Sequence, residues 1–177
     1  MSQLVPDPSA VADLVVRMTR RTWPSGAADR DRYFAELGLV DAGPAGAPMN
    51  HPGTQRRRFT TPLSGVVDAS ISLFRGELLG IHITCYNQRQ DNGPQAQEGF
   101  AAVKQLLTDA FGPPTEEWGS LREPACLWQL GAVSVDMYCC FQRDPSGTMV
   151  GTSHTARSAA YDAAASAPHP APPPIGQ

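Results

Sequence analysis

An alternating stretch from Val66 to Tyr86 constrains the fold of this chain more than any other segment. Apolar residues occupy every second position on both sides of Arg75-Gly76, and polar or small residues fill the positions between them. A period of two predicts two antiparallel strands joined by a tight turn, with one apolar and one polar face. Because a lone hairpin is unstable in water, further strands or a helix must cover its apolar face.

The rest of the chain supplies those partners. Helical spacing of apolar residues predicts helices at residues 9–20, 27–37 and 95–111. Alternation predicts further strands at residues 56–61, 126–130 and 132–142, of which the last two form a second hairpin. Residues 148–150 fit either a last strand or a loop. The Gly- and Pro-rich segment 41–54 and the segment 115–124, which contains Trp118, are expected to be loops.

The expected order of elements is ααβββαββ, followed by a weak C-terminal helix. This order predicts an α+β fold in which helices pack on one face of a curved antiparallel sheet of about five strands. We expect a single domain over 9–150 after an N-terminal extension at 1–8. A marginal helix or linker is expected at 151–167, and a disordered Pro-rich tail at 168–177.

Composition and charge argue against several classes of function. The 177 residues are 41% hydrophobic and 18% charged, with a net charge of −3, so no global positive field favours nucleic acid or an anionic membrane. No apolar run approaches the roughly 20 residues that a spanning helix needs, and no secretory signal is evident at the start. We therefore expect a cytoplasmic protein that binds neither nucleic acid nor membrane.

The four cysteines show no spacing typical of zinc sites. Cys85, Cys126 and Cys139 lie on predicted apolar strand faces, and Cys140 follows directly. Free, buried thiols that act as small apolar residues are expected. A redox pair or soft-metal site at Cys139-Cys140 is the alternative, although neighbouring strand residues point to opposite faces.

The sequence contains no recognisable catalytic, nucleotide-binding or metal-binding motif, so we predict neither catalytic residues nor a cofactor nor a metal site. One constellation could support acid–base chemistry or hold a metal: Asp68, His82 and Asp136 all lie on polar strand faces. Whether they meet depends on the register between strands, which local sequence does not reveal.

The strongest local charge is the run Arg56-Arg57-Arg58. Alternation places Arg56 and Arg58 on one face of their strand and Arg57 on the other. Basic residues on an edge strand protect it against stray pairing, which is one interpretation. The other is a binding site for an acidic protein partner.

The polar face of the sheet offers a second candidate for partner recognition. Its predicted members are His82, Thr84, Tyr86, Asp136 and Tyr138. Tyrosine and arginine are enriched where proteins bind one another, so this face and the arginine run form the predicted partner-binding surface.

Several of these features together resemble an uncharacterised family of small actinobacterial proteins. The resemblance rests on the helix–Trp–helix start from Leu14 to Leu37, the two hairpins, and the segment 106–115, followed by Trp118 and Trp128. The order of elements is also similar to the type III secretion chaperone-like fold. That similarity implies a protein that escorts or neutralises another protein.

The leading expectation is therefore a non-enzymatic, cytoplasmic protein-binding module, immunity-like or secretion-chaperone-like, whose partner is another protein such as a secreted effector or toxin. A homodimer is a further option. One alternative is a small-molecule-binding protein or enzyme that uses His82 and Asp136 in a pocket between sheet and helices. Another is a structural subunit of an assembly.

Overall fold

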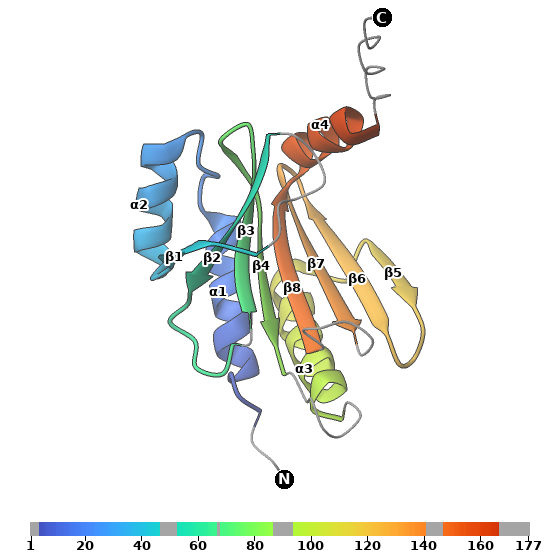
Figure 1. Ribbon diagram of the computed structural model, residues 1–177. Coiled ribbons are helices and arrows are strands. Elements are labelled where there is room, and N and C mark those ends of the chain that lie inside the picture. Colours follow the sequence, from blue (N-terminus) through green and yellow to red (C-terminus); the bar gives the residue numbers. More distant parts are fainter. Residues whose placement is uncertain (1–3, 47–52, 67, 87–93, 141–146, 167–177) are drawn as a thin grey trace, which may run out of the picture.

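A single antiparallel sheet organises the molecule (Figure 1). The structure is a computed structural model that describes residues 4–46, 53–66, 68–86, 94–140 and 147–166. Its eight described strands lie in the order β1-β2-β3-β4-β8-β7-β6-β5. In chain order these strands are Val40–Pro44, Thr54–Thr60, Asp68–Phe74, Glu77–Cys85, Glu116–Gly119, Pro124–Leu130, Val133–Cys140 and Gly147–His154. The last strand therefore pairs with β4 and β7 and joins the two halves of the sheet.

Four helices complete the described part of the chain: α1 (Pro8–Arg20), α2 (Ala27–Leu37), α3 (Pro94–Phe111) and α4 (Thr155–Ser166). Local sequence explains where the first two begin and end. The carboxylate of Asp7 accepts a hydrogen bond from the Ser9 backbone N–H at the start of α1. Gly38 ends α2 with a left-handed φ of 72°, a conformation that glycine adopts at little cost.

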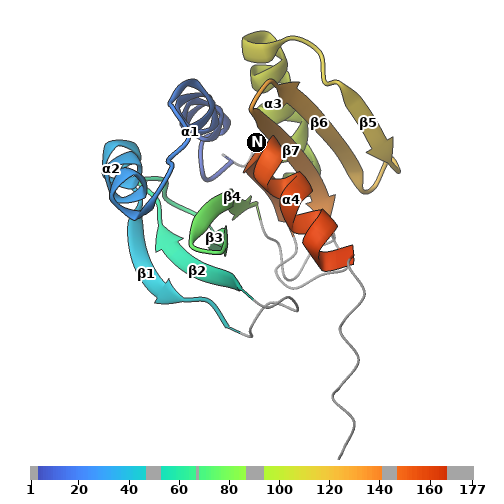
Figure 2. The same cartoon turned by 90° about the horizontal axis from the view of Figure 1, so that it is seen from above.

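The hydrophobic core lies between the sheet and the pair α1 and α3, which pack against each other behind the strands (Figure 2). Leu14 and Met18 of α1 and Val103 and Leu107 of α3 are almost completely buried. On the sheet side they face apolar residues of the central strands, among them Ile81, Ile83, Val135, Met137 and Trp128. The helix predicted at 95–111 therefore packs on the sheet, and its strand contacts are mainly with β7 and β8.

The predicted fold class is wrong in two respects, although α+β holds. The sheet has eight described strands instead of about five, because β1, β5 and β8 form in segments that are rich in glycine, proline or polar residues. Antiparallel pairing uses backbone hydrogen bonds, so these segments join the sheet without a strong side-chain pattern. The helices also do not share one face, since α4 lies at the end of the sheet, whereas α1 and α3 lie behind the strands (Figure 1).

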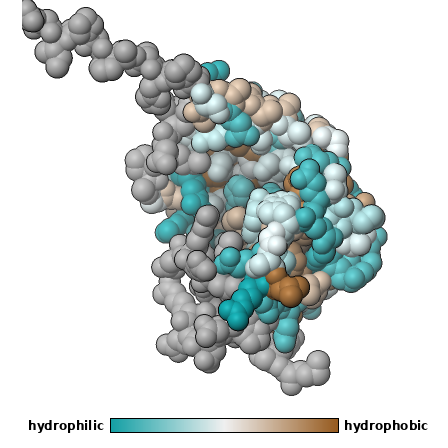
Figure 3. Space-filling model, turned by 90° about the vertical axis from the view of Figure 1, so that its right-hand side faces the viewer, coloured by the Kyte–Doolittle hydropathy of each residue, from teal (hydrophilic) through white to brown (hydrophobic). Residues whose placement is uncertain are grey.

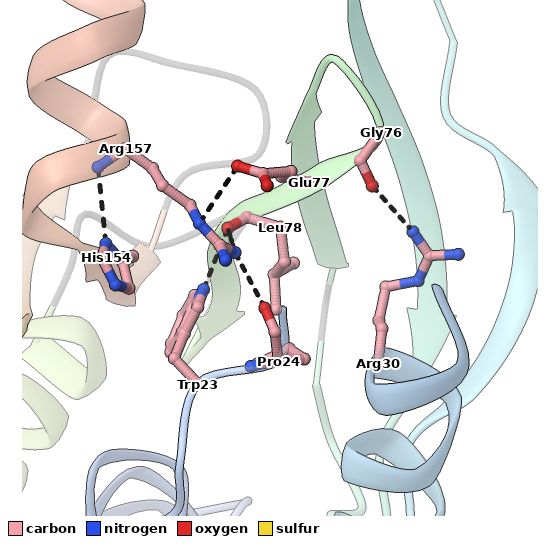
Figure 4. A network of polar contacts seen from close by, with 8 residues as sticks. All are labelled: Trp23, Pro24, Arg30, Gly76, Glu77, Leu78, His154 and Arg157. Carbon is pink, nitrogen blue, oxygen red and sulfur yellow. Dashed lines mark hydrogen bonds and ion pairs between the residues drawn. The ribbon is translucent and has the colours of Figure 1, made fainter. Parts of the chain in front are cut away.

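Arg157 fixes the start of α4 to the rest of the molecule (Figure 4). Its Nη1 donates hydrogen bonds to the backbone carbonyls of Pro24 and Leu78, at 2.9 and 3.0 Å. Its guanidinium also lies 3.3 Å from the carboxylate of Glu77. The Leu78 carbonyl accepts a second hydrogen bond from Trp23 Nε1, so one backbone oxygen connects α4, the β3–β4 hairpin and the link between α1 and α2.

Three cysteine side chains are described, and all three are buried free thiols, as predicted: Cys85, Cys126 and Cys139. Burial raises the pKa of both Cys85 and Cys126 to about 12, which keeps these thiols neutral at physiological pH. The side chain of Cys140 and the Pro-rich tail lie outside the described residues. None of the described helices is both long and apolar enough to cross a membrane.

Candidate functional site

The sheet face opposite α1 and α3 is the candidate site, and we call it the polar face. The strand register aligns its residues in rows that run across the sheet. The central row contains, in order from β2 to β5, Arg58, Ser70, His82, Gly151, Asp136, Leu127 and Glu116. The register thus places His82 and Asp136 on either side of one glycine, which the sequence alone could not establish.

Gly151 allows these two side chains to approach each other. A Cβ built on Gly151 would lie 2.7 and 2.9 Å from the carboxylate oxygens of Asp136 and 2.9 Å from Nδ1 of His82. Gly80 plays the same part at the other end of the imidazole, where a Cβ would lie 3.2 Å from Nε2 and 2.8 Å from the hydroxyl of Ser153. Glycine inside a strand is unfavourable unless another group needs the space, and here the His82 ring lies over both glycines.

Burial shifts the pKa values of the two side chains in opposite directions. Desolvation lowers the pKa of His82 to about 4, with a smaller contribution from the positive charge of Arg56. Desolvation raises the pKa of Asp136 to about 6, although its own backbone N–H partly opposes the shift. At pH 7 the imidazole is therefore neutral and the carboxylate is mostly ionised.

Neither side chain has a described side-chain partner. Nδ1 of His82 is buried and has no hydrogen-bond partner among the described residues. No described side chain forms a hydrogen bond or ion pair with Asp136 within normal distances. A buried polar atom without a partner costs free energy, so such atoms are uncommon in native proteins and often mark functional positions.

Asp68, the third member of the predicted constellation, lies elsewhere on the polar face. It pairs with Arg56 at 3.3 Å and with Arg58 at 3.7 Å. Arg56 also donates two hydrogen bonds to the hydroxyl of Ser70. Asp68 therefore belongs to a charge cluster with these arginines, whereas only His82 and Asp136 are brought together.

The arginine run does not lie on an edge strand, contrary to the first interpretation, because β1 pairs with the outer side of β2. As alternation predicted, Arg57 points to the other face from its neighbours, and it pairs with Asp41 of β1 at 2.8 Å. Each of the three arginines thus has an acidic neighbour in the sheet. The run is internally neutralised, which weakens the case for an acidic partner at this position.

Two residues of the predicted partner-binding surface are buried. Thr84 is 7% exposed, and Tyr86 is 3% exposed. Tyr86 follows the end of β4 with a φ of 57°, which turns its ring away from the polar face. The ring instead lies against α3, where a Cβ on Gly99 would be 2.2 Å from Tyr86 Cδ2. Alternation cannot anticipate this change, since it applies only within the strand.

The polar face carries an aromatic pair, Trp118 and Tyr138, of which the sequence predicted only one member as a site residue. Tyr138 of β7 was among the predicted site residues, and Trp118 of β5 lies edge-on to it at 5.7 Å between ring centroids. Trp118 is 44% exposed, which is unusual for so large an apolar ring. Figure 3 views the molecule from the β5 side, where the described surface is mainly hydrophilic and brown areas are small. An exposed tryptophan inside a predicted loop was the signal that could have identified this position.

The arrangement limits what the site can do chemically. Among the described residues, no group of three or more His, Cys, Asp or Glu side chains could hold a metal ion. The space between the sheet and the helices is filled by core side chains, so His82 and Asp136 do not line a pocket there. A separate cleft of about 400 Å³ lies at the junction of α1 and α2, where Arg21 pairs with Glu36.

Comparisons with known proteins do not assign the chain to a family. No protein-family model and no curated protein matches it. Among solved structures, the crystal structure of a cysteine-rich secretory protein from Staphylococcus aureus subsp. aureus Mu50 is similar, with 11% sequence identity and a TM-score of 0.34. The match covers 78% of this chain and 50% of that one, so the chain spans about half the length of that protein.

Proposed function

We propose that this protein is a non-enzymatic module that binds another protein through the polar face, in the manner expected of an immunity-like or secretion-chaperone-like partner. The observation that carries the proposal is the exposed ring of Trp118, which packs edge-on against the half-buried Tyr138 on the same sheet face as the Asp136 carboxylate. Aromatic rings next to polar groups are typical of the residues that contribute most to protein–protein affinity.

The construction of the polar face supports binding of a macromolecule. Small residues surround His82 and Asp136 in the middle of the sheet, among them Ser70, Gly80, Ser134, Gly151 and Ser153. Arginines with a shared carboxylate lie on one side of this region, and the aromatic pair lies on the other. Charged, small polar and aromatic groups therefore lie side by side on one sheet face, where Ser70 is buried and Trp118 is exposed.

The experiment compares two charge-introducing variants of the full chain as bait in the lysate of the native host. Trp118→Arg places a cation on the aromatic pair, whereas Glu98→Arg places one on the exposed surface of α3, on the other side of the molecule. We expect the wild type and Glu98→Arg to capture the same protein and Trp118→Arg to lose it.

Two outcomes would contradict the proposal. Equal capture by both variants would place the binding surface elsewhere. A wild-type chain that captures nothing but forms a dimer by light scattering, with the dimer lost in Trp118→Arg, would assign the face to self-association. Far-ultraviolet circular dichroism of both variants separates a loss of binding from a loss of folding.

A further inference from the structure

Asp136 is a largely buried acceptor in the middle of the polar face, and no described side chain donates to it. The carboxylate of Asp136 forms no ion pair with a described residue, although Arg56, Arg57 and Arg58 of the same sheet each have an acidic neighbour. Burial has already raised its pKa to about 6, so the ionised form is poorly stabilised by its surroundings. A cation brought to this position would compensate part of that desolvation.

The groups around Asp136 favour a particular kind of cation. Tyr138 follows it by two residues on the same face of β7, and Trp118 contacts the Tyr138 ring. Successive residues on one strand face lie roughly 7 Å apart, about the length of an extended arginine side chain. A guanidinium can form a two-pronged hydrogen bond with a carboxylate and also stack on an aromatic ring, which an ammonium does less well.

His82 adds no cation that would compete for the carboxylate. The imidazole is neutral, and its unpartnered Nδ1 faces the carboxylate across Gly151. Ser153 lies beside Nε2 at the other end of the ring. A neutral ring in this position supplies no positive charge to Asp136, so the charge of the carboxylate remains available to an incoming cation.

We propose that Asp136, flanked by Tyr138 and Trp118, binds an arginine side chain of the protein partner. The inference rests on the proposed function, because it names the chemical group that the partner presents to the polar face. It also reverses the expectation from the arginine run: the recognition charge of this chain is the carboxylate, and the partner contributes the cation.

The test uses the full chain and small probes, so it does not need the partner. N-acetyl-L-arginine methylamide is titrated into 15N-labelled protein, and the indole N–H signal of Trp118 is followed by NMR. The citrulline analogue has nearly the same shape but no charge, and it serves as the control probe. We expect the arginine probe to shift the Trp118 signal in a saturable way and the citrulline analogue to leave it nearly unchanged.

Variants assign the effect to the carboxylate. Asp136→Asn is expected to weaken binding of the arginine probe on the order of tenfold, which corresponds to about 1.4 kcal/mol. Asp68→Asn, on the same face but already paired with arginines, is expected to leave binding within twofold of the wild type. The dispersion of the remaining NMR signals reports whether each variant is folded.

The outcomes separate this inference from the proposed function. Equal binding of the arginine and citrulline probes, or unchanged binding by Asp136→Asn, would overturn the arginine site. Capture of a partner that depends on Trp118 would still support the polar face in that case. Conversely, the chain could bind the arginine probe in a charge-dependent way and yet capture no partner. That result would contradict the proposed function but not the arginine site.

Discussion

The two faces of the sheet use opposite strategies. The face under α1 and α3 is filled with large apolar side chains, and residues such as Leu107 and Trp128 have almost no exposed surface. The polar face is built around small residues at its centre, so that His82 and Asp136 can lie over Gly80 and Gly151. The difference indicates that the first face supplies stability, whereas the second accepts unsatisfied polar groups at some cost to stability.

The largest change in stability is expected when a core side chain is removed. Leu107→Ala should lower the free energy of unfolding by about 2–5 kcal/mol, because the site between α3 and the sheet cannot collapse around the cavity. Urea unfolding measures the change. Leu121→Ala serves as the matched control, since this leucine is 98% exposed and its loss should cost no more than about 0.5 kcal/mol. A small effect of Leu107→Ala would mean that α3 does not cover the sheet.

The second test uses the pH dependence of the polar face. Folding raises the pKa of Asp136 from 3.8 to about 6, so its contribution to stability falls as the pH rises through that window. Folding lowers the pKa of His82 from 6.5 to about 4, so its contribution rises with pH over nearly the same window. The two contributions oppose each other in the wild type, each on the order of 3 kcal/mol.

Single variants should reveal the two opposed contributions. Relative to the wild type, Asp136→Asn should lose stability as the pH falls from about 6.5 to about 4. His82→Gln should gain stability over the same range. Urea unfolding of all three proteins at several pH values measures these differences. Other titrating groups are the same in all three proteins, so their contributions cancel in the comparison. Parallel curves for the wild type and both variants would show that folding leaves the two pKa values unchanged.

The smallest of the three expected effects concerns Gly151, which lies between His82 and Asp136. In a strand interior, Gly→Ala normally stabilises, by roughly 0.5–1 kcal/mol. At Gly151 we expect the opposite, a loss of about 1–3 kcal/mol, because the new Cβ would crowd the Asp136 carboxylate and the His82 ring. The loss should be smaller in an Asp136→Ala background, as a double-mutant cycle would measure. If Gly151→Ala costs the same stability with and without Asp136→Ala, the new Cβ is crowded by atoms other than the Asp136 carboxylate.

Parts of the site could be predicted because they depend on local pattern. Alternation assigned His82 and Asp136 to the same kind of face, and it separated Arg57 from Arg56 and Arg58. Alternation failed at Tyr86, where the backbone leaves the strand with a positive φ. It also could not separate Asp68 from the pair, because His82 and Asp136 meet only through Gly151 of β8, which pairs with both.

The sequence by itself determined the apolar stripes of α1 and α3, the two hairpins and the burial of the cysteines, because each follows from periodicity within one short segment. Tertiary structure alone decided that Gly147–His154 would lie at the centre of the sheet, between β4 and β7. Pairing of that strand relies on backbone hydrogen bonds, and its small residues carry little pattern of their own. Only that placement brings His82 and Asp136, which are 54 residues apart in the chain, to the same glycine.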